Sequence, residues 1–444
     1  MTGGDDDLTV FRRARLGDAR RRWAFAAILV LALVLRLGYV AVTPDYRIVH
    51  DARDYDVHAR SIASGHGFAL LGPGPTRKTA FRPPAYPVLL AGVYSLGGHK
   101  WKDTHGRILP GRIANALVGT AVVALIGVLC MQLFDRRVAL AAMVLAAFYV
   151  PLILIGGSLM SEPLFAAFVL GALVAALHHR AAAHRHRWAV LAGVLAGLAI
   201  LTRANAAVIL LPLVVAVWDV RPRWSRRALT APVLVVALAI LTVAPWTVRN
   251  TVVLGSVVPV TTQLGTSLAG TYNSAAFADT VNPASWRSLR RVPDYQDITR
   301  PSRWRQIPEA PMEKKLRAGA LHFIENHPGY VAKVAFWNTR RALDLAGLRW
   351  SRHTASTISA GPGWADAGVF MFWAVAALAI AGRLTARARR LPLLVLAVPV
   401  LLYLSVVFLA FETPRYRTGI DPFIVMLAAL ALVAAWEAVA ARRS

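Results

Sequence analysis

The sequence contains the stretch AFAAILVLALVLRLGYVAV at residues 24–42, in which Arg36 is the one charged residue. A transmembrane helix needs about 20 apolar residues to cross the hydrocarbon core of a bilayer. The hydrophobic part of a secretory signal peptide is shorter, about 7–15 residues. The residues that follow, Val42-Thr43-Pro44-Asp45, also make a poor cleavage site. We therefore interpret this stretch as a retained transmembrane helix.

The composition of the whole chain is that of a membrane protein. Of the 444 residues, 57% are hydrophobic and 16% are charged, whereas soluble domains carry about 45–50% apolar and about 25% charged residues. The formal net charge of +27 would suggest nucleic acid in a soluble protein. Here the basic residues bunch between apolar runs, which indicates membrane topology and no nucleic-acid partner. The single cysteine, Cys130, excludes a cysteine-cluster metal site.

Apolar windows of membrane-spanning size recur along the chain. They predict an all-α integral membrane protein with about ten transmembrane helices and two large extracytoplasmic loops. The predicted spans lie near residues 24–42, 111–133, 138–156, 163–178, 188–201, 204–218, 228–246, 364–382, 391–410 and 418–439.

The positions of the basic residues agree with about ten transmembrane helices. Arginines precede the first span, which predicts a cytoplasmic N-terminus under the positive-inside rule. Every second connection is then short and basic, as the rule requires. These cytoplasmic segments lie at residues 135–137, 178–187, 221–227, 383–390 and 442–443. The frequent Ala, Val, Leu and Arg are compatible with a GC-rich bacterial genome, so we expect a multi-pass protein of a bacterial cell membrane.

The topology divides the chain into four parts. The two long outer segments hold most of the Asp, Glu, Tyr, Trp and Pro residues outside the helices, so we expect the active surface to face away from the cytoplasm. The parts are a basic cytoplasmic N-terminus at 1–23, an N-terminal transmembrane module at 24–246 with the outer loop 43–110, a large outer loop at 247–363 and C-terminal transmembrane helices at 364–444.

The first outer loop begins with HDARDYDVHAR at residues 50–60, and its composition predicts a short helix that stops at Gly65 and Gly67. Asp51 falls in the first turn of this helix, where the helix dipole favours an ionised carboxylate. A carboxylate at the membrane rim can act as a general base towards a hydroxyl group. The simpler interpretation of Asp51 is a helix cap or a solvated side chain.

Helical spacing places Asp51 and Tyr55 on one stripe and His50, Asp54 and His58 on the neighbouring stripe. The second stripe can be drawn as a metal site. Three such residues on one short helix are more often solvated, so we predict no metal ligand. A divalent metal is compatible with the chain but nothing in the sequence indicates one, and we expect no other cofactor.

Basic residues then mark anion-binding candidates. The segment TRKTAFRPPAYP at residues 76–87 predicts a rigid turn, because prolines restrict the backbone. In this turn Lys78 and Arg82 are suited to bind a phosphate, or alternatively lipid headgroups. Arg415 and Arg417 flank Tyr416 on a face that should carry few arginines, and such a pair matches phosphate geometry.

Three more charged residues stand at predicted helix ends. Glu162 lies in Ser161-Glu162-Pro163, which is partly a structural helix start, but an acidic residue at the membrane face is also a site candidate. Arg203 lies at the outer end of an apolar hairpin, where snorkelling to the interface is the alternative explanation. Arg249 follows Pro245-Trp246 where the seventh predicted helix ends.

Taken in order, these motifs resemble those of the membrane-embedded GT-C glycosyltransferases. The most similar group is glycosyltransferase family 39, the protein O-mannosyltransferase-like and aminoarabinose-transferase-like family. The motifs are Asp51…Tyr55…Gly65-x-Gly67, Arg82-Pro83-Pro84-x-Tyr86-Pro87, Ser161-Glu162-Pro163-Leu164, Gly197-Leu198-Ala199-x-Leu201-Thr202-Arg203, Pro245-Trp246-x-x-Arg249-Asn250 and Arg415-Tyr416-Arg417.

The resemblance implies a GT-C type bundle that transfers a sugar from a polyprenyl-phosphate carrier. Asp51 matches the position of the family's catalytic base, and Arg82, Arg203 and the pair Arg415 and Arg417 match arginines near the donor phosphate. The chain lacks an adjacent acidic pair at Asp51, which leaves the choice between Asp51 and Asp54 open. It also ends after the tenth predicted helix without a soluble C-terminal domain, so the acceptor stays open among glycans, lipids and proteins.

The sequence thus predicts an inverting transfer to an acceptor hydroxyl on the extracytoplasmic face, with membrane lipids around the protein. A transporter or flippase of lipid-linked sugars is the alternative, although such proteins place charges midway through helices. The catalytic candidates are Asp51, Asp54 and Glu162. The substrate-binding candidates are Tyr55, His58, Lys78, Arg82, Arg203, Arg249, Arg415, Tyr416 and Arg417.

Overall fold

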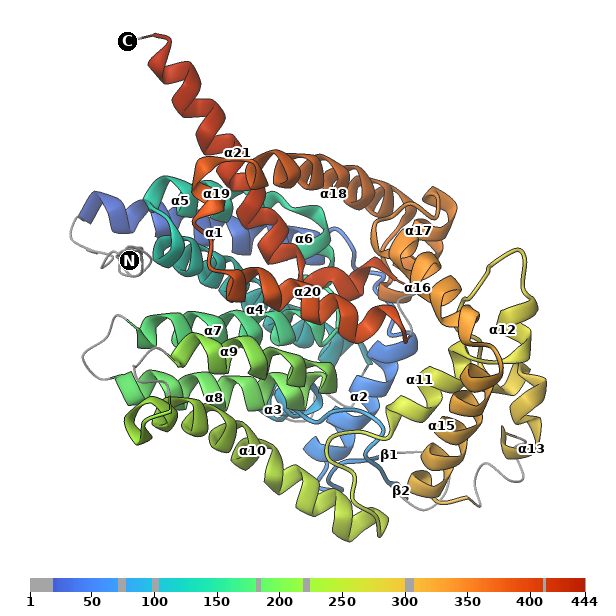
Figure 1. Cartoon of the computed structure of the whole chain (residues 1–444). Helices are drawn as coiled ribbons and strands as arrows, with labels where there is room; N and C mark the ends of the chain where they lie inside the picture. The colour runs from blue at the N-terminus through green and yellow to red at the C-terminus, as the bar shows by residue number, and fades with distance from the viewer. Residues whose placement is uncertain are drawn as a thin grey trace.

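A computed structural model describes most of the chain, and its fold is almost entirely helical (Figure 1). Residues 1–18, most of the predicted N-terminal segment, lie outside the described residues, as do parts of two predicted basic connections. The described residues are 19–70, 77–97, 104–180, 185–218, 224–299, 307–409 and 413–443.

The apolar helices form a bundle that occupies the left and upper parts of Figure 1. They are α1 (Ala19–Ala41), α4 (Thr104–Leu133), α5 (Arg136–Phe148), α6 (Val150–Gly156), α7 (Glu162–His179), α8 (Arg185–Thr202), the 3-10 helix η3 (Ala204–Ile209), α9 (Leu210–Val217), α10 (Arg226–Leu254), α18 (Pro362–Arg383), the short α19 (Ala386–Arg389), α20 (Leu393–Val407) and α21 (Asp421–Ala441).

Each of the predicted spans falls on one of these helices, and the chain is a multi-pass membrane protein. Within the described residues, 6 helices are long and apolar enough to cross a bilayer, or 7 if α5 and α6 form one span bent by 61°. The remaining predicted spans fall on shorter apolar helices, namely α8, η3 with α9, and α20. The all-α membrane fold is therefore confirmed.

Close packing against α8 fixes the position of α10, which forms part of the wall of the candidate site described below. Helix α8 packs against both α7 and α10. A Cβ atom at Gly193 would lie 2.6 Å from the carbonyl oxygen of Val235, and one at Gly197 would lie 2.5 Å from the Thr242 Cβ. Small residues at such crossings let membrane helices approach closely, so these glycines hold α10 against the bundle.

The first outer loop folds as a helix, a hairpin and a second helix. Helix α2 (His50–Ala63) confirms the predicted short helix, and its end is followed by Gly65 and Gly67 with φ of 80° and 70°. The two-stranded ribbon pairs β1 (Ala69–Leu70) with β2 (Arg77–Lys78) antiparallel. Helix α3 (Ala85–Leu96) then begins after the proline turn.

The second outer segment forms a helical layer beside α2 at the right of Figure 1. Its core buries Tyr272, Tyr295, Leu316 and Tyr330. Its elements are α11 (Gln263–Thr271), α12 (Ser274–Ala278), η4 (Leu289–Arg291), η5 (Pro293–Tyr295), α13 (Gln296–Thr299), α15 (Glu309–Asn326), α16 (Pro328–Ala342), α17 (Leu348–Ala355) and η6 (Ser356–Ile358).

One carboxylate joins the two outer segments. Glu309, at the start of α15, accepts hydrogen bonds from Thr79 Oγ1 at 2.6 Å and from the Ala80 amide at 2.8 Å. It also accepts one from Thr262 Oγ1 at 2.7 Å. Hydrogen bonds to a charged acceptor are stronger than neutral ones, so Glu309 holds the start of α11 against the turn that leads to Arg82.

We expect Glu309→Ala to lower the stability of the folded protein by about 2–4 kcal/mol, because it leaves three donors without this acceptor. The midpoint of thermal unfolding in detergent measures the effect. Glu325→Ala, on the same helix with a side chain that is 75% exposed, is the matched control and should change stability by less than about 0.5 kcal/mol. Equal midpoints for the two variants would show that Glu309 does not hold the segments together.

Candidate active site

Asp51 lies in the first turn of α2, where the sequence predicts it, and two arginines from distant segments hold it. Arg82 Nη2 lies 2.5 Å from Asp51 Oδ1, and Arg415 Nη2 donates to Asp51 Oδ2. The Asp51 side chain keeps 20% of its surface exposed. Burial alone would raise the pKa of this carboxyl, but the positive charges of Arg82 and Arg415 hold the pKa well below its usual range.

Arg82 stands in the turn that the prolines were predicted to make rigid. It donates from Nε and Nη2 to Asp54 Oδ2 at 3.1 and 2.6 Å, in addition to its bond with Asp51. Its guanidinium lies 5.5 Å from the ring centre of Tyr55. Asp54 is 40% exposed at the rim and does not line the cavity described below. Of the two candidate bases, Asp51 is the one that faces the cavity.

A third carboxylate lies next to Arg203 and Arg415. Glu162, the first residue of α7, is 2% exposed, and its Oε1 lies 3.0 Å from Arg203 Nη1 and 3.7 Å from Arg415 Nε. The Tyr55 hydroxyl lies 3.0 Å from Ser161 Oγ, next to Glu162. Because Glu162 does not line the cavity, its position suits a role in orienting the arginines.

The carboxylates of Asp51, Asp54 and Glu162 thus face the guanidiniums of Arg82, Arg203 and Arg415, and their formal charges cancel. These residues come from α2, α7, the proline turn, the loop after α8, and η7 (Pro414–Gly419), the 3-10 helix that precedes α21. An anion that enters must compete with the carboxylates for the arginines.

A cavity of about 980 Å³ opens beside this cluster, at the upper end of the size range of about 300–1,000 Å³ for ligand sites. Its polar end contains Asp51, Tyr55, Arg82, Arg203 and Tyr416. Arg203 also lies 4.8 Å from the ring centre of Tyr416. The rest of its wall is largely apolar and comes from α8, η3, α9, α10 and α20. A ligand that fits has an anionic head and a long apolar stem.

Five predicted binding residues do not line this cavity, namely His58, Lys78, Arg249, Arg415 and Arg417. His58 is fully buried, its Nδ1 lies 3.2 Å from the Ala69 carbonyl oxygen, and burial lowers its pKa. Lys78 is exposed on β2. Arg249 donates to the carbonyl oxygens of Thr79 and Phe68 at 2.6 and 2.7 Å, and thereby ties the end of α10 to the ribbon of the first outer loop.

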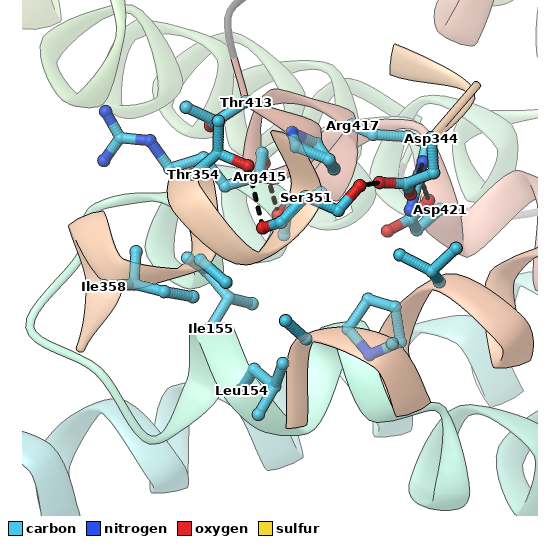
Figure 2. A pocket seen from close by; sticks show the side chains of 17 residues that line it. Leu154, Ile155, Asp344, Ser351, Thr354, Ile358, Thr413, Arg415, Arg417 and Asp421 are labelled. Carbon is cyan, nitrogen blue, oxygen red and sulfur yellow. Dashed lines mark hydrogen bonds and ion pairs between the residues drawn. The ribbon is translucent and has the colours of Figure 1, made fainter. Parts of the chain in front are cut away.

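Arg417 points away from Asp51 and lines a separate pocket, which Figure 2 shows with Asp344, Ser351 and Asp421 around it. Its Nε lies 2.9 Å from Asp421 Oδ1 and its Nη1 3.0 Å from Asp344 Oδ2, and the side chain is 4% exposed. Breaking a buried ion pair strongly destabilises a protein, because it leaves a buried charge without a partner. Arg417 therefore anchors η7, while Arg415 binds Asp51 and also lines this second pocket, and Tyr416 lines the cavity.

The structure also reveals residues that the sequence did not single out. Glu309 is the link between the outer segments, and Gln263 and Ser267 of α11 line the cavity. The sequence signal for Gln263 and Ser267 was weak, because it consisted only of two polar residues four positions apart on one short helix. Among the described residues, no group of three or more His, Cys, Asp or Glu side chains is arranged to hold a metal ion.

The sequence of residues 82–248 matches the family described as dolichyl-phosphate-mannose-protein mannosyltransferase. This segment begins at Arg82 and ends within α10, so it includes Glu162 and Arg203 but neither α2 nor η7. Among curated proteins, no sequence matches this chain significantly.

Two solved structures of an archaeal oligosaccharyltransferase share the fold at low sequence identity. The apo oligosaccharyltransferase of Archaeoglobus fulgidus has a TM-score of 0.57 at 12% identity, over 97% of this chain and 52% of that one. The archaeal oligosaccharyltransferase AglB from Archaeoglobus fulgidus, with an inhibitory peptide and a dolichol-phosphate, has a TM-score of 0.54 at 14% identity, over 96% and 52%. ArnT from Cupriavidus metallidurans, bound to undecaprenyl phosphate, has a TM-score of 0.43 at 15% identity, over 92% and 77%.

The chain spans about half the length of the archaeal oligosaccharyltransferases. The likeness to them establishes a common fold, and the family match supplies the independent sequence signal. Together, these findings make the chain similar to a mannosyltransferase family over residues 82–248 and to the archaeal oligosaccharyltransferases in its fold.

Proposed function

We propose that the protein transfers a sugar from a polyprenyl-phosphate carrier to a hydroxyl group of an acceptor. The observation that carries this proposal is the cavity with Asp51, Arg82 and Arg203 at one end and apolar walls along the rest. A polyprenyl phosphate has this shape and polarity. The dolichol-phosphate bound in the archaeal oligosaccharyltransferase of the same fold supports the assignment.

In this proposal the donor phosphate binds to the guanidiniums of Arg82, Arg203 and Arg415. Guanidinium groups match phosphate oxygens with forked, charge-assisted hydrogen bonds. The polyprenyl tail then follows the apolar wall formed by residues such as Val208 and Ile240. Fixed arginines stabilise the negative charge that develops on the leaving phosphate without reorganising during the reaction.

Asp51 is the proposed general base. Held between two arginines with a lowered pKa, it is a weak base until the donor phosphate draws hydrogen bonds away from it. It then accepts the proton of the acceptor hydroxyl while that oxygen attacks the anomeric carbon. The bond between that carbon and the phosphate oxygen breaks, its electron pair stays on the phosphate, and the configuration inverts.

The proposed reaction takes place on the extracytoplasmic face of a bacterial cell membrane. The basic connections between helices support a cytoplasmic N-terminus. The two outer segments, which supply Asp51, Arg82 and the α11 side of the cavity, then lie together on the opposite side.

We expect Asp51→Asn to reduce transfer by about 100-fold or more, because an amide cannot accept the proton. Asp54→Asn is the matched control: it removes the same charge from the same helix but leaves Asp51 facing the cavity, so a much smaller loss is expected. Polyprenyl phosphate released by the purified protein in nanodiscs, measured by mass spectrometry, follows the reaction.

Two outcomes would contradict this proposal. Equal activity of Asp51→Asn and wild type would remove Asp51 as the base. A wild-type protein that moves lipid-linked sugars across the bilayer but releases no polyprenyl phosphate would be a transporter or flippase, because transport breaks no bond between sugar and phosphate.

The pH dependence follows from the lowered pKa of Asp51. In the free protein this pKa lies below its usual value of about 3.9, so Asp51 is ionised at neutral and mildly acidic pH. We therefore expect kcat/KM for the donor to show no acidic limb from Asp51 between about pH 5 and pH 8. In the donor complex the phosphate shares the arginines and the pKa of Asp51 rises, so the acidic limb of kcat lies at higher pH. Profiles of kcat and of kcat/KM against pH over this range test this coupling. Acidic limbs at the same pH in both profiles would contradict it.

A further inference from the structure

Helix α11 of the second outer segment covers part of the cavity, and it presents polar side chains there. Gln263 and Ser267 both line the cavity and lie one helical turn apart. Neither side chain makes a hydrogen bond to any described residue. An amide and a hydroxyl group both donate and accept hydrogen bonds, so the two residues offer a ligand both kinds of partner.

Contacts at each end fix where α11 lies relative to the arginines. Thr261 Oγ1 donates to the Phe81 carbonyl oxygen at 2.5 Å, and the Thr262 amide donates to the Ala80 carbonyl oxygen at 3.1 Å. The chain just before Gln263 is thus bonded to the residues just before Arg82. At the other end, Thr271 Oγ1 donates to the Leu409 carbonyl oxygen at 2.8 Å.

This placement brings Gln263 and Ser267 to the same cavity as Arg82. If Arg82 binds the donor phosphate and the tail follows the apolar wall, the group on the other side of the phosphate is left with the polar part of the cavity, to which α11 contributes Gln263 and Ser267. In a polyprenyl-phosphate donor this group is the sugar. The position of α11 therefore makes it the recognition element for the sugar.

Another uncharged polar side chain of the lining already has a partner in the protein, because Asn205 donates to Ser405 at 3.0 Å.

We propose that Gln263 and Ser267 recognise the donor sugar through its hydroxyl groups. The inference rests on the proposed function, since it takes the donor phosphate to lie at Arg82. It adds the residues that bind the sugar.

The test compares lipids with and without a sugar. Binding of undecaprenyl phosphate glucose and of undecaprenyl phosphate is measured on the full chain in nanodiscs. For Gln263→Met and Ser267→Ala we expect affinity for the glucosyl lipid to fall about three- to tenfold each, the effect of one lost neutral hydrogen bond. Affinity for undecaprenyl phosphate should stay within about twofold, because the phosphate and tail contacts remain.

Gln296→Met, an exposed residue of α13 in the same outer segment, is the matched control and should bind both lipids as wild type does. Equal losses for the sugar-bearing and sugarless lipids, or no loss in either variant, would overturn the assignment of α11.

Failure of the proposed function gives a different result. If wild type binds the glucosyl lipid through Gln263 and Ser267 but never releases undecaprenyl phosphate in the presence of acceptors, the transfer reaction is wrong and the sugar recognition stands. If transfer occurs and the α11 variants bind both lipids as wild type does, the sugar recognition alone is wrong.

Discussion

The carboxylate of Asp51, held between Arg82 and Arg415, is the interaction on which the rest of the site depends. It joins α2, the proline turn and η7, which are far apart in the chain. A buried ion pair is stabilising only when its remaining hydrogen-bonding groups are satisfied. Here Asp54 and Glu162 supply those partners, so the cluster forms as one balanced unit. The same balance lets a bound anion change the cluster. An anion that takes the hydrogen bonds of the arginines frees the carboxylate of Asp51.

The two outer segments build different halves of this site. The first supplies Asp51, Asp54 and Arg82, on α2 and the proline turn, whereas the second supplies α11 over the cavity. Glu309 joins them by accepting three hydrogen bonds. A displacement of the second segment would therefore move the polar face of α11 relative to Arg82. This coupling gives the second segment a role in the site beyond shielding it from water.

The short η7 helix illustrates how one turn serves two purposes. Arg415 binds Asp51 in the charged cluster and Tyr416 lines the cavity. Arg417 is instead held by Asp344 and Asp421 in the second pocket, which Arg415 also lines (Figure 2). All three are polar residues in one motif, and their spacing alone does not separate a substrate-facing residue from an anchor. The difference arises because consecutive residues of a tight helix point in different directions.

The sequence by itself determined the membrane fold, the positions of the helices and the short helix that carries Asp51, because apolar length and helix-ending glycines are local signals. It also identified the main charged residues of the cluster. Only the tertiary structure decided that Asp51 rather than Asp54 faces the cavity, that His58 and Arg249 lie outside it and that α11 covers it. These features depend on contacts between residues up to 364 positions apart, such as Asp51 and Arg415. No local pattern encodes such pairings, since they arise only when the helices pack.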